Sequence, residues 1–291
     1  MGALLRLLRP RQWSKNTLVF AGIIFSQQYG SVTNWLHGLK VFAIFCIVAS
    51  GIYIINDLFD VEKDRLHPTK RNRPIASGAV KPGMAIILAL VLLTVGIGWS
   101  WTMNRWVFGI VLGYSVVMVL YSAWLKHLLL VDVFIIATGF TARAVVGAAA
   151  IEVFISKWLT VCAFFIGLTL ALIKRRQEIA RLDGELEKGR KSLHEAPPLF
   201  VWDLWIMMIS AITILAYTLY TFDPVTVAKV GSQRLMYTTP IVVFALLRYQ
   251  VGVYTADRGE DPTEAVLTDP WILLAIAGWI GMVLLILMDV L

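Results

Sequence analysis

Three aspartates and an asparagine follow a long apolar run, at spacings that could bind a divalent cation. They are Asn56, Asp57, Asp60 and Asp64, and the apolar run covers residues 41–55. On an ideal helix the aspartates fall within about 60° of one another, and Asn56 lies about 40° beyond Asp60. Carboxylates on one helical face repel one another unless a cation lies between them, and Mg²⁺ often joins protein carboxylates to substrate phosphates. The spacing therefore predicts a site for magnesium and diphosphate.

The residues after this cluster combine cations with turn formers. Pro68 and Pro74 do not fit a regular helix, so residues 66–82 are predicted to form a structured loop that folds back over the site, within a metal and diphosphate segment of residues 57–82. The candidates for binding phosphate in it are Arg65, His67, Lys70, Arg71 and Arg73. His67 could equally shape the turn before Pro68. The alternative for the whole segment is a solvated acidic turn that nearby cations balance.

A second polar stretch, 174–198, is predicted to form another loop on the same side of the membrane. It begins with Lys174, Arg175 and Glu178, which could complete a diphosphate site from the other half of the chain. The alternative is a surface ion pair between Lys174 and Glu178, because residues four apart on a helix are neighbours.

Arg143 lies well inside an apolar stretch, where a permanent cation costs about 2.5–3.5 kcal/mol to insert. It must face a polar interior, so we expect it to bind substrate phosphate or to pair with a buried carboxylate. Lys15 and Asn16, close to Trp13, could serve the same phosphate or could belong to an interfacial anchor.

The amino-acid composition is typical of a membrane protein. Hydrophobic residues make up 58% of the 291 residues and charged residues 15%, which is too apolar for a soluble domain. The chain is therefore expected to be an all-α, polytopic membrane protein with about nine transmembrane helices. The predicted spans are about 12–28, 36–56, 83–102, 105–123, 128–150, 157–173, 199–221, 235–254 and 271–290.

The distribution of charge orients this arrangement. Of the 26 lysines and arginines, 20 lie on the side that holds the N-terminus and the acidic cluster, five lie on the other side, and Arg143 is inside a span. Positive residues collect in the cytoplasm, so the site is predicted on the cytoplasmic side of the cell membrane. Lipid phosphate explains the sequence pI of about 9.5 without any nucleic-acid partner.

Several motifs carry a resemblance to a known family. They are Arg9-Pro-Arg-Gln-Trp-x-Lys-Asn16, Asn56-Asp-x-x-Asp-x-x-x-Asp64, Arg73-Pro-Ile-Ala-Ser-Gly78, Gly139-Phe-x-x-Arg143 and Lys174-Arg-x-x-Glu178. Together they resemble the UbiA superfamily of intramembrane prenyltransferases, over nearly all of residues 1–291 as one domain. Within it they are similar to the branch that transfers phosphoribosyl groups to polyprenyl phosphates. Aromatic prenyltransferases of the superfamily usually have a second Asp-rich motif where this chain has Lys174-Arg-x-x-Glu178.

The resemblance implies a ring of helices around a cytoplasm-facing polar cavity, and a Mg²⁺-dependent transferase. The donor would be phosphoribosyl diphosphate and the acceptor a polyprenyl (decaprenyl-type) phosphate, in the synthesis of a cell-wall glycolipid precursor. Asn56, Asp57, Asp60 and Asp64 would hold the metal, with the three aspartates as catalytic residues. Lys15, Asn16 and Arg143 would hold the lipid phosphate. The donor would be held by Arg65, His67, Lys70, Arg71, Arg73, Lys174, Arg175 and Glu178. The oligomeric state stays open, a homo-oligomer included.

Two alternatives remain. A prenyltransferase with a polyprenyl diphosphate donor and an aromatic or other small acceptor would use the same acidic cluster, although it needs fewer cations. A transporter or flippase would place its charges near mid-membrane, whereas here the acids gather at one end.

Overall fold

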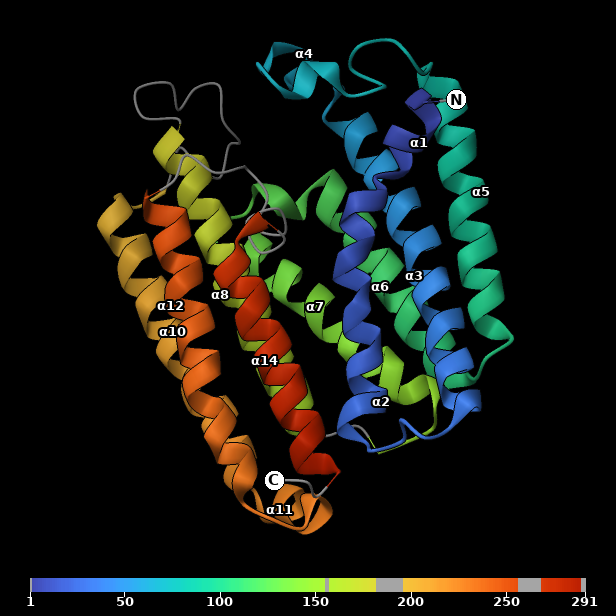
Figure 1. Cartoon of the computed structure of the whole chain (residues 1–291). Helices are drawn as coiled ribbons and strands as arrows, with labels where there is room; N and C mark the ends of the chain where they lie inside the picture. The colour runs from blue at the N-terminus through green and yellow to red at the C-terminus, as the bar shows by residue number, and fades with distance from the viewer. Residues whose placement is uncertain (1, 155–156, 182–195, 256–267, 289–291) are drawn as a thin grey trace. The chain divides into compact units, whose positions relative to one another are not determined.

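The computed structural model describes residues 2–154, 157–181, 196–255 and 268–288, and these contain helices and no strand (Figure 1). They form two compact units, the first made of residues 2–154 and the second of the remainder. The prediction of an all-α chain is confirmed.

The first unit contains seven α-helices and three 3₁₀ helices in the described chain. In order they are α1 (Gly2–Leu8), η1 (Pro10–Phe20), α2 (Ala21–Phe25), α3 (Val32–Phe59), α4 (Val61–Leu66), η2 (Lys70–Asn72), α5 (Pro82–Trp101), α6 (Arg105–Ala123), η3 (Leu125–His127) and α7 (Val131–Ala150).

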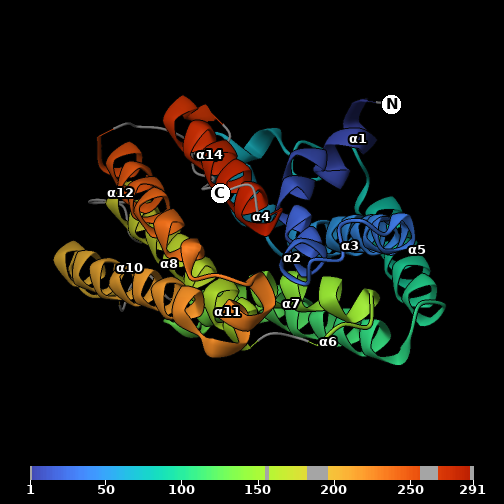
Figure 2. The same ribbon diagram turned by 60° about the horizontal axis from the view of Figure 1, so that its bottom comes forward.

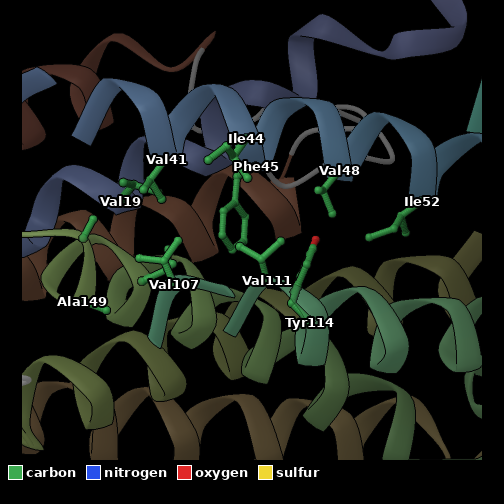
Figure 3. Close-up of a cluster of buried hydrophobic side chains, with 12 residues drawn as sticks. Val19, Val41, Ile44, Phe45, Val48, Ile52, Val107, Val111, Tyr114 and Ala149 are labelled. Atoms are coloured by element: carbon green, nitrogen blue, oxygen red, sulfur yellow. The ribbon is translucent and has the colours of Figure 1, made fainter. Parts of the chain in front are cut away.

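Helix α3 is the centre of this unit and contacts η1, α5, α6 and α7 (Figure 2). Its buried residues, such as Val41, Phe45 and Val48, pack against Val107 and Tyr114 of α6 (Figure 3). The rings of Phe45 and Tyr114 are 5.2 Å apart, between their centroids. At about 1.5 Å per residue, 28 residues extend about 42 Å, which exceeds the roughly 30 Å of a hydrocarbon core. Helix α3 is therefore long enough to extend beyond the hydrocarbon core.

Local residues set where these helices begin and end. The Ser31 side chain caps α3 by accepting a hydrogen bond from the Asn34 amide, and Asn104 caps α6 in the same way through two amides. Pro82 occupies the first turn of α5, where its missing N–H costs nothing. These caps confirm the boundaries predicted around residues 83 and 105.

The second unit consists of α8 (Lys157–Arg181), α10 (Leu199–Phe222), α11 (Pro224–Val230), η5 (Arg234–Thr238), α12 (Thr239–Thr255) and α14 (Pro270–Leu287). Helix α10 packs along α8, and α12 packs along α14. Asp269 caps α14 by accepting hydrogen bonds from the Trp271 and Ile272 amides, and it also pairs with Arg248 of α12 at 2.9 Å.

Seven helices of the described chain are long and apolar enough to cross a membrane: α3, α5, α6, α7, α8, α10 and α14. The chain is therefore a multi-pass membrane protein, although the expected number of nine is not reached by these criteria. The predicted span 12–28 is instead η1 followed by the five-residue α2, and 235–254 contains η5 and the 17-residue α12.

Candidate active site

The acidic cluster lies where α3 gives way to α4. Asp57 is in the last turn of α3, Asp60 joins the two helices, and Asp64 is in α4, which turns away from the axis of α3 (Figure 1). Helical hydrogen bonds persist across the junction, from the Asp60 amide to Asn56 and from the Asp64 amide to Asp60. Because this spacing is kept, Asp57 and Asp64 come close enough to share one arginine. Both are almost fully buried, with exposed fractions of 2% and 4%.

Arg73 joins these two carboxylates. Its Nη1 donates to Asp64 Oδ2 at 2.7 Å and to Asp57 Oδ1 at 3.1 Å. Between α3 and α5 the chain contains two short helices, α4 and η2, and it turns back so that Arg73 reaches the acids. Hydrogen bonds from the Ser77 amide to Arg73 and from the Val80 amide to Pro74 stabilise this return.

Arg9 supplies a second cation to Asp57. Its Nη2 donates to Asp57 Oδ1 at 2.5 Å, and its guanidinium lies 5.1 Å from the centroid of the Tyr53 ring. The backbone of Arg9 is left-handed, with φ of 52°, at the break between α1 and η1. A non-glycine residue in that region is strained, so the surrounding contacts must hold Arg9 in place.

Lys126, in η3, supplies the third cation. Its side chain is 1% exposed, and Nζ donates to Asp60 Oδ1 at 2.6 Å and to Asn56 Oδ1 at 3.4 Å. A buried ammonium is stable only beside an acid, so Asp60 and Lys126 depend on each other.

Burial raises the pKa of Asp64 above its usual value, and the nearby Asp57 and Asp60 carboxylates add to this rise. Arg73 opposes it, both through its charge and through its hydrogen bond. The charged form of Asp64 therefore depends on a neighbouring cation.

The donor chemistry of the cluster suits Mg²⁺, which prefers carboxylate oxygens and commonly takes one or two of them together with substrate phosphates. In the described part of the chain, however, no three His, Cys, Asp or Glu side chains gather as a metal site. The acids instead pair with different cations. Asp57 and Asp64 pair with Arg73, and Asp60 pairs with Lys126. The four-ligand metal site thus stays a prediction, for a state in which these cations have moved to other partners.

Arg143 forms a separate polar centre inside the apolar core. It is 6% exposed in the middle of α7 and donates from Nε to Asn16 at 2.8 Å, from Nη1 to the Gly139 carbonyl at 2.6 Å and from Nη2 to the Tyr114 hydroxyl at 2.7 Å. These partners are neutral, and no carboxylate pairs with Arg143 in the described chain. The alternative of a buried ion pair is therefore not what the structure shows. A buried cation with only neutral partners is suited to bind an anion.

Close backbone packing positions this arginine. A Cβ atom on Gly147 would lie 1.8 Å from the Val19 carbonyl oxygen, and one on Gly22 would lie 2.5 Å from the Ala148 amide. Only glycine lets η1 and α2 approach α7 so closely. This approach brings the fully buried Asn16 to the Arg143 side chain.

The segment η1 also connects the two polar centres along α3. Arg9 contacts Asp57, the Trp13 indole donates to the Ser50 hydroxyl at 3.1 Å, and the Asn16 amide donates to the Cys46 sulfur at 3.3 Å. Cys46 lies 11 positions before Asp57, or about 16 Å along the helix. The acidic cluster and the Asn16–Arg143 pair therefore lie at different depths.

The remaining candidates of the first unit take different positions. Lys15 donates to Gln12 at 2.5 Å within η1. His67 Nδ1 accepts from the Thr69 and Lys70 amides at 3.3 and 3.4 Å, so this nitrogen shapes the turn. Arg65 pairs with Glu62 at 3.0 Å and is half exposed. Arg71 is exposed and its guanidinium makes no polar contact within the described residues, which leaves its charge available.

Lys174, Arg175 and Glu178 belong to the second unit. They lie in the last turns of α8, which continues to Arg181 rather than ending near 173. The buried Arg175 pairs with Glu178, one turn later on α8. The predicted loop 174–198 is thus helical at its start, and its residues 182–195 lie outside the described chain.

Three residues of these centres were not among the sequence candidates: Arg9, Lys126 and Tyr114. Arg9 opens one of the motifs named above, so it could have been included. Lys126 and Tyr114 had no local pattern to mark them, because their partners are far away in the sequence.

Comparison with known proteins agrees with this architecture. The model of the UbiA prenyltransferase family matches residues 17–268. The decaprenyl-phosphate phosphoribosyltransferase of Corynebacterium glutamicum is 34% identical over 95% of this chain and 84% of its own length. The protein of the same name from Mycolicibacterium smegmatis is 33% identical over 97% of this chain and 91% of its own.

A solved structure shares the fold. A UbiA homolog from Archaeoglobus fulgidus, bound to DMAPP and Mg²⁺, superposes with a TM-score of 0.72 over 98% of this chain and 99% of that one, at 19% identity. The match to the family model and the identity with these relatives show that this chain belongs to the UbiA prenyltransferase family.

Proposed function

We propose that this protein transfers the 5-phosphoribosyl group of phosphoribosyl diphosphate to a polyprenyl phosphate and releases diphosphate. The observation that carries the proposal is the likeness to enzymes named decaprenyl-phosphate phosphoribosyltransferase over almost the whole chain. The geometry supports it, since cations flank every acid of the cluster and a separate buried cation without an acid lies deeper in the same unit.

The chain's own residues suit this reaction. An oxygen of the lipid phosphate attacks the anomeric carbon of the ribose, and the bond from that carbon to the diphosphate oxygen breaks. The phosphate is already ionised, so no general base is needed. Direct displacement inverts the anomeric centre.

The acidic end would bind the donor. Arg9, Arg73 and Lys126 would contact the leaving diphosphate after Asp57, Asp60, Asp64 and Asn56 turn to Mg²⁺. A bound Mg²⁺ would neutralise charge on that leaving group. Fixed cations around a group that gains negative charge lower the barrier, because they need no reorganisation during the reaction. Arg65, Lys70 and Arg71 would hold the rest of the donor, and His67 would shape the loop that carries them. The assignment of Lys174, Arg175 and Glu178 to the donor stays a prediction from the sequence.

The Asn16–Arg143 pair would bind the lipid phosphate, with Lys15 nearby. Its depth supports this assignment, because a phosphate on a membrane lipid reaches a site among the spans while its chain stays in the bilayer. The 20 to 5 distribution of cations supports a cytoplasmic position for the acidic end.

An assay of the purified protein tests the proposal. The protein in detergent, with Mg²⁺, polyprenyl phosphate and ribose-labelled phosphoribosyl diphosphate, is expected to move label into the lipid phase. The matched control is Asp57→Asn, which keeps the shape of the side chain and removes its charge. A parallel reaction contains polyprenyl diphosphate and an aromatic acceptor. Turnover in that reaction alone would replace the proposal with the prenyltransferase alternative.

A further inference from the structure

A polar cavity of about 290 Å³ lies at the opposite end of α3 from the acidic cluster. The start of α3, the connection between α5 and α6, and the end of α7 line it, all within the first unit (Figure 1). Lys40, in its lining, precedes Asp57 by 17 positions, or about 26 Å of helix. Since a hydrocarbon core is about 30 Å thick, the cavity lies at the other membrane boundary and outside the proposed reaction.

Charged groups of both signs line this cavity. Asn34, His37 and Lys40 follow one another at three-residue spacing on α3, and Glu152 comes from the end of α7. The side chains of His37, Lys40 and Glu152 make no hydrogen bond or ion pair with any residue that the structure describes. Lys40 and Glu152 thus face one cavity without neutralising each other. A ligand with both an anionic and a cationic group would satisfy them together.

The backbone holds Glu152 in an unusual conformation. Its φ is 54°, in the left-handed region that residues other than glycine rarely occupy. The Asn104 side chain, also in the lining, donates to the Ala149 carbonyl at 2.9 Å and caps α6 at the same time. The cavity wall is therefore built by specific contacts, and strained residues of this kind are common where ligands bind.

Tryptophans place the cavity at the level of lipid headgroups. Trp99 lines it, and Trp35, Trp101 and Trp106 are 37%, 68% and 63% exposed near the same helix ends. Exposed tryptophans gather at membrane–water interfaces. A ligand from the adjoining leaflet would therefore present its headgroup at this height.

We infer that this cavity binds the headgroup of a zwitterionic phospholipid with a primary ammonium. His37 and Lys40 bind its phosphate, Glu152 binds its ammonium, and the acyl chains lie along the apolar surface beside Trp99. Ligand sites usually occupy about 300–1,000 Å³, so the size of this cavity suits a headgroup better than a larger molecule.

Native mass spectrometry of the full chain tests the inference. The protein is equilibrated in mixed micelles with equal amounts of phosphatidylethanolamine, phosphatidylglycerol and phosphatidylcholine, and the lipids that remain bound are counted. The variants are Lys40→Gln, which changes an exposed side chain, the double variant His37→Gln with Lys40→Gln, and Glu152→Gln. The matched control is Arg105→Ala, because Arg105 lies at the same membrane boundary but does not line the cavity. Size-exclusion profiles show that each variant is folded.

We expect one phosphatidylethanolamine per chain in the wild type and in Arg105→Ala. The double variant is expected to bind it roughly tenfold to a hundredfold more weakly, since charge-assisted hydrogen bonds are lost. Glu152→Gln is expected to lose the preference for phosphatidylethanolamine over phosphatidylglycerol. Equal retention of the three lipids by the wild type, or an equal loss in Arg105→Ala and the double variant, would overturn the inference. Unchanged selectivity in Glu152→Gln would overturn the role of the ammonium.

Discussion

Replacing Arg73 with alanine tests how the acidic cluster is held together. Arg73 is 25% exposed and bonds two carboxylates that are 2% and 5% exposed. Asp57 keeps Arg9 as a partner after the change, so the loss falls mainly on Asp64. A charge-assisted hydrogen bond to a buried carboxylate is worth about 1.5–3 kcal/mol, and we expect Arg73→Ala to destabilise the protein by about that amount near pH 7.5.

The effect should depend on pH in a defined direction. Burial already raises the pKa of Asp64, and removal of Arg73 takes away the main influence that opposes the rise. A carboxyl group whose pKa is higher in the folded than in the unfolded state destabilises the folded state in full above the folded-state pKa. This loss of stability disappears as the pH falls and the carboxylate takes up a proton. The difference in stability between Arg73→Ala and the wild type should therefore narrow as the pH falls below neutral.

The measurement is the apparent Tm of the purified protein in detergent between pH 5.5 and 8, for four proteins that form a double-mutant cycle. They are the wild type, Arg73→Ala, Asp64→Asn and the double variant. In the Asp64→Asn background, Arg73→Ala should cost less and should lose its pH dependence, because the buried charge is gone. An equal cost in both backgrounds at every pH would refute the proposed dependence of Asp64 on Arg73.

Three further predictions concern the metal, the deep cation and the packing. Excess EDTA should abolish turnover, and Asp57→Asn or Asp64→Asn should slow it by orders of magnitude while the protein stays folded; full activity in EDTA would contradict the metal site. Arg143→Ala should raise the KM for polyprenyl phosphate more than the KM for the donor, and Arg143→Lys should restore it only in part, because lysine lacks the planar fork; a change in the donor KM alone would reverse the assignment. Gly147→Ala should lower the Tm strongly, because its Cβ would meet the Val19 carbonyl at 1.8 Å, whereas Gly113→Ala in α6 meets no atom within 4 Å and should leave the Tm unchanged or raise it.

Sequence patterns predict those features that depend on neighbours along the chain. Asp57, Asp60 and Asp64 do come together, because helical hydrogen bonds continue through Asp60. Hydropathy detects only the apolar part of α8, so the predicted span ends near residue 173, whereas the helix continues to Arg181. Its continuation, through Lys174, Arg175 and Glu178, consists of residues that favour helices. Hydropathy locates the membrane, whereas helix propensity decides where the helix stops.

The counter-ions could not be predicted in this way. Arg9 is 48 positions from Asp57, and Lys126 is 66 positions from Asp60, so no local spacing connects them. A buried carboxylate needs a cation nearby, so burial alone predicts that some cation pairs with it. Its identity depends on which chain segment packs against the end of α3, and that is a tertiary property.

The segment η1 shows how much depends on the type of helix. It is an 11-residue 3₁₀ helix, in which residues three apart lie on one face. Trp13, Asn16 and Val19 follow that spacing, and all three face the core, where they contact Ser50, Arg143 and the cluster around Phe45. In an α-helix each step of three would turn the next side chain about 60° away from the line of the first, so Val19 would lie about 120° from Trp13. The same residues in an α-helical span would therefore not place Trp13, Asn16 and Val19 on one line toward α3 and α7. The 3₁₀ geometry of η1 is what brings Asn16 to Arg143, while Arg9, the residue before η1, contacts Asp57.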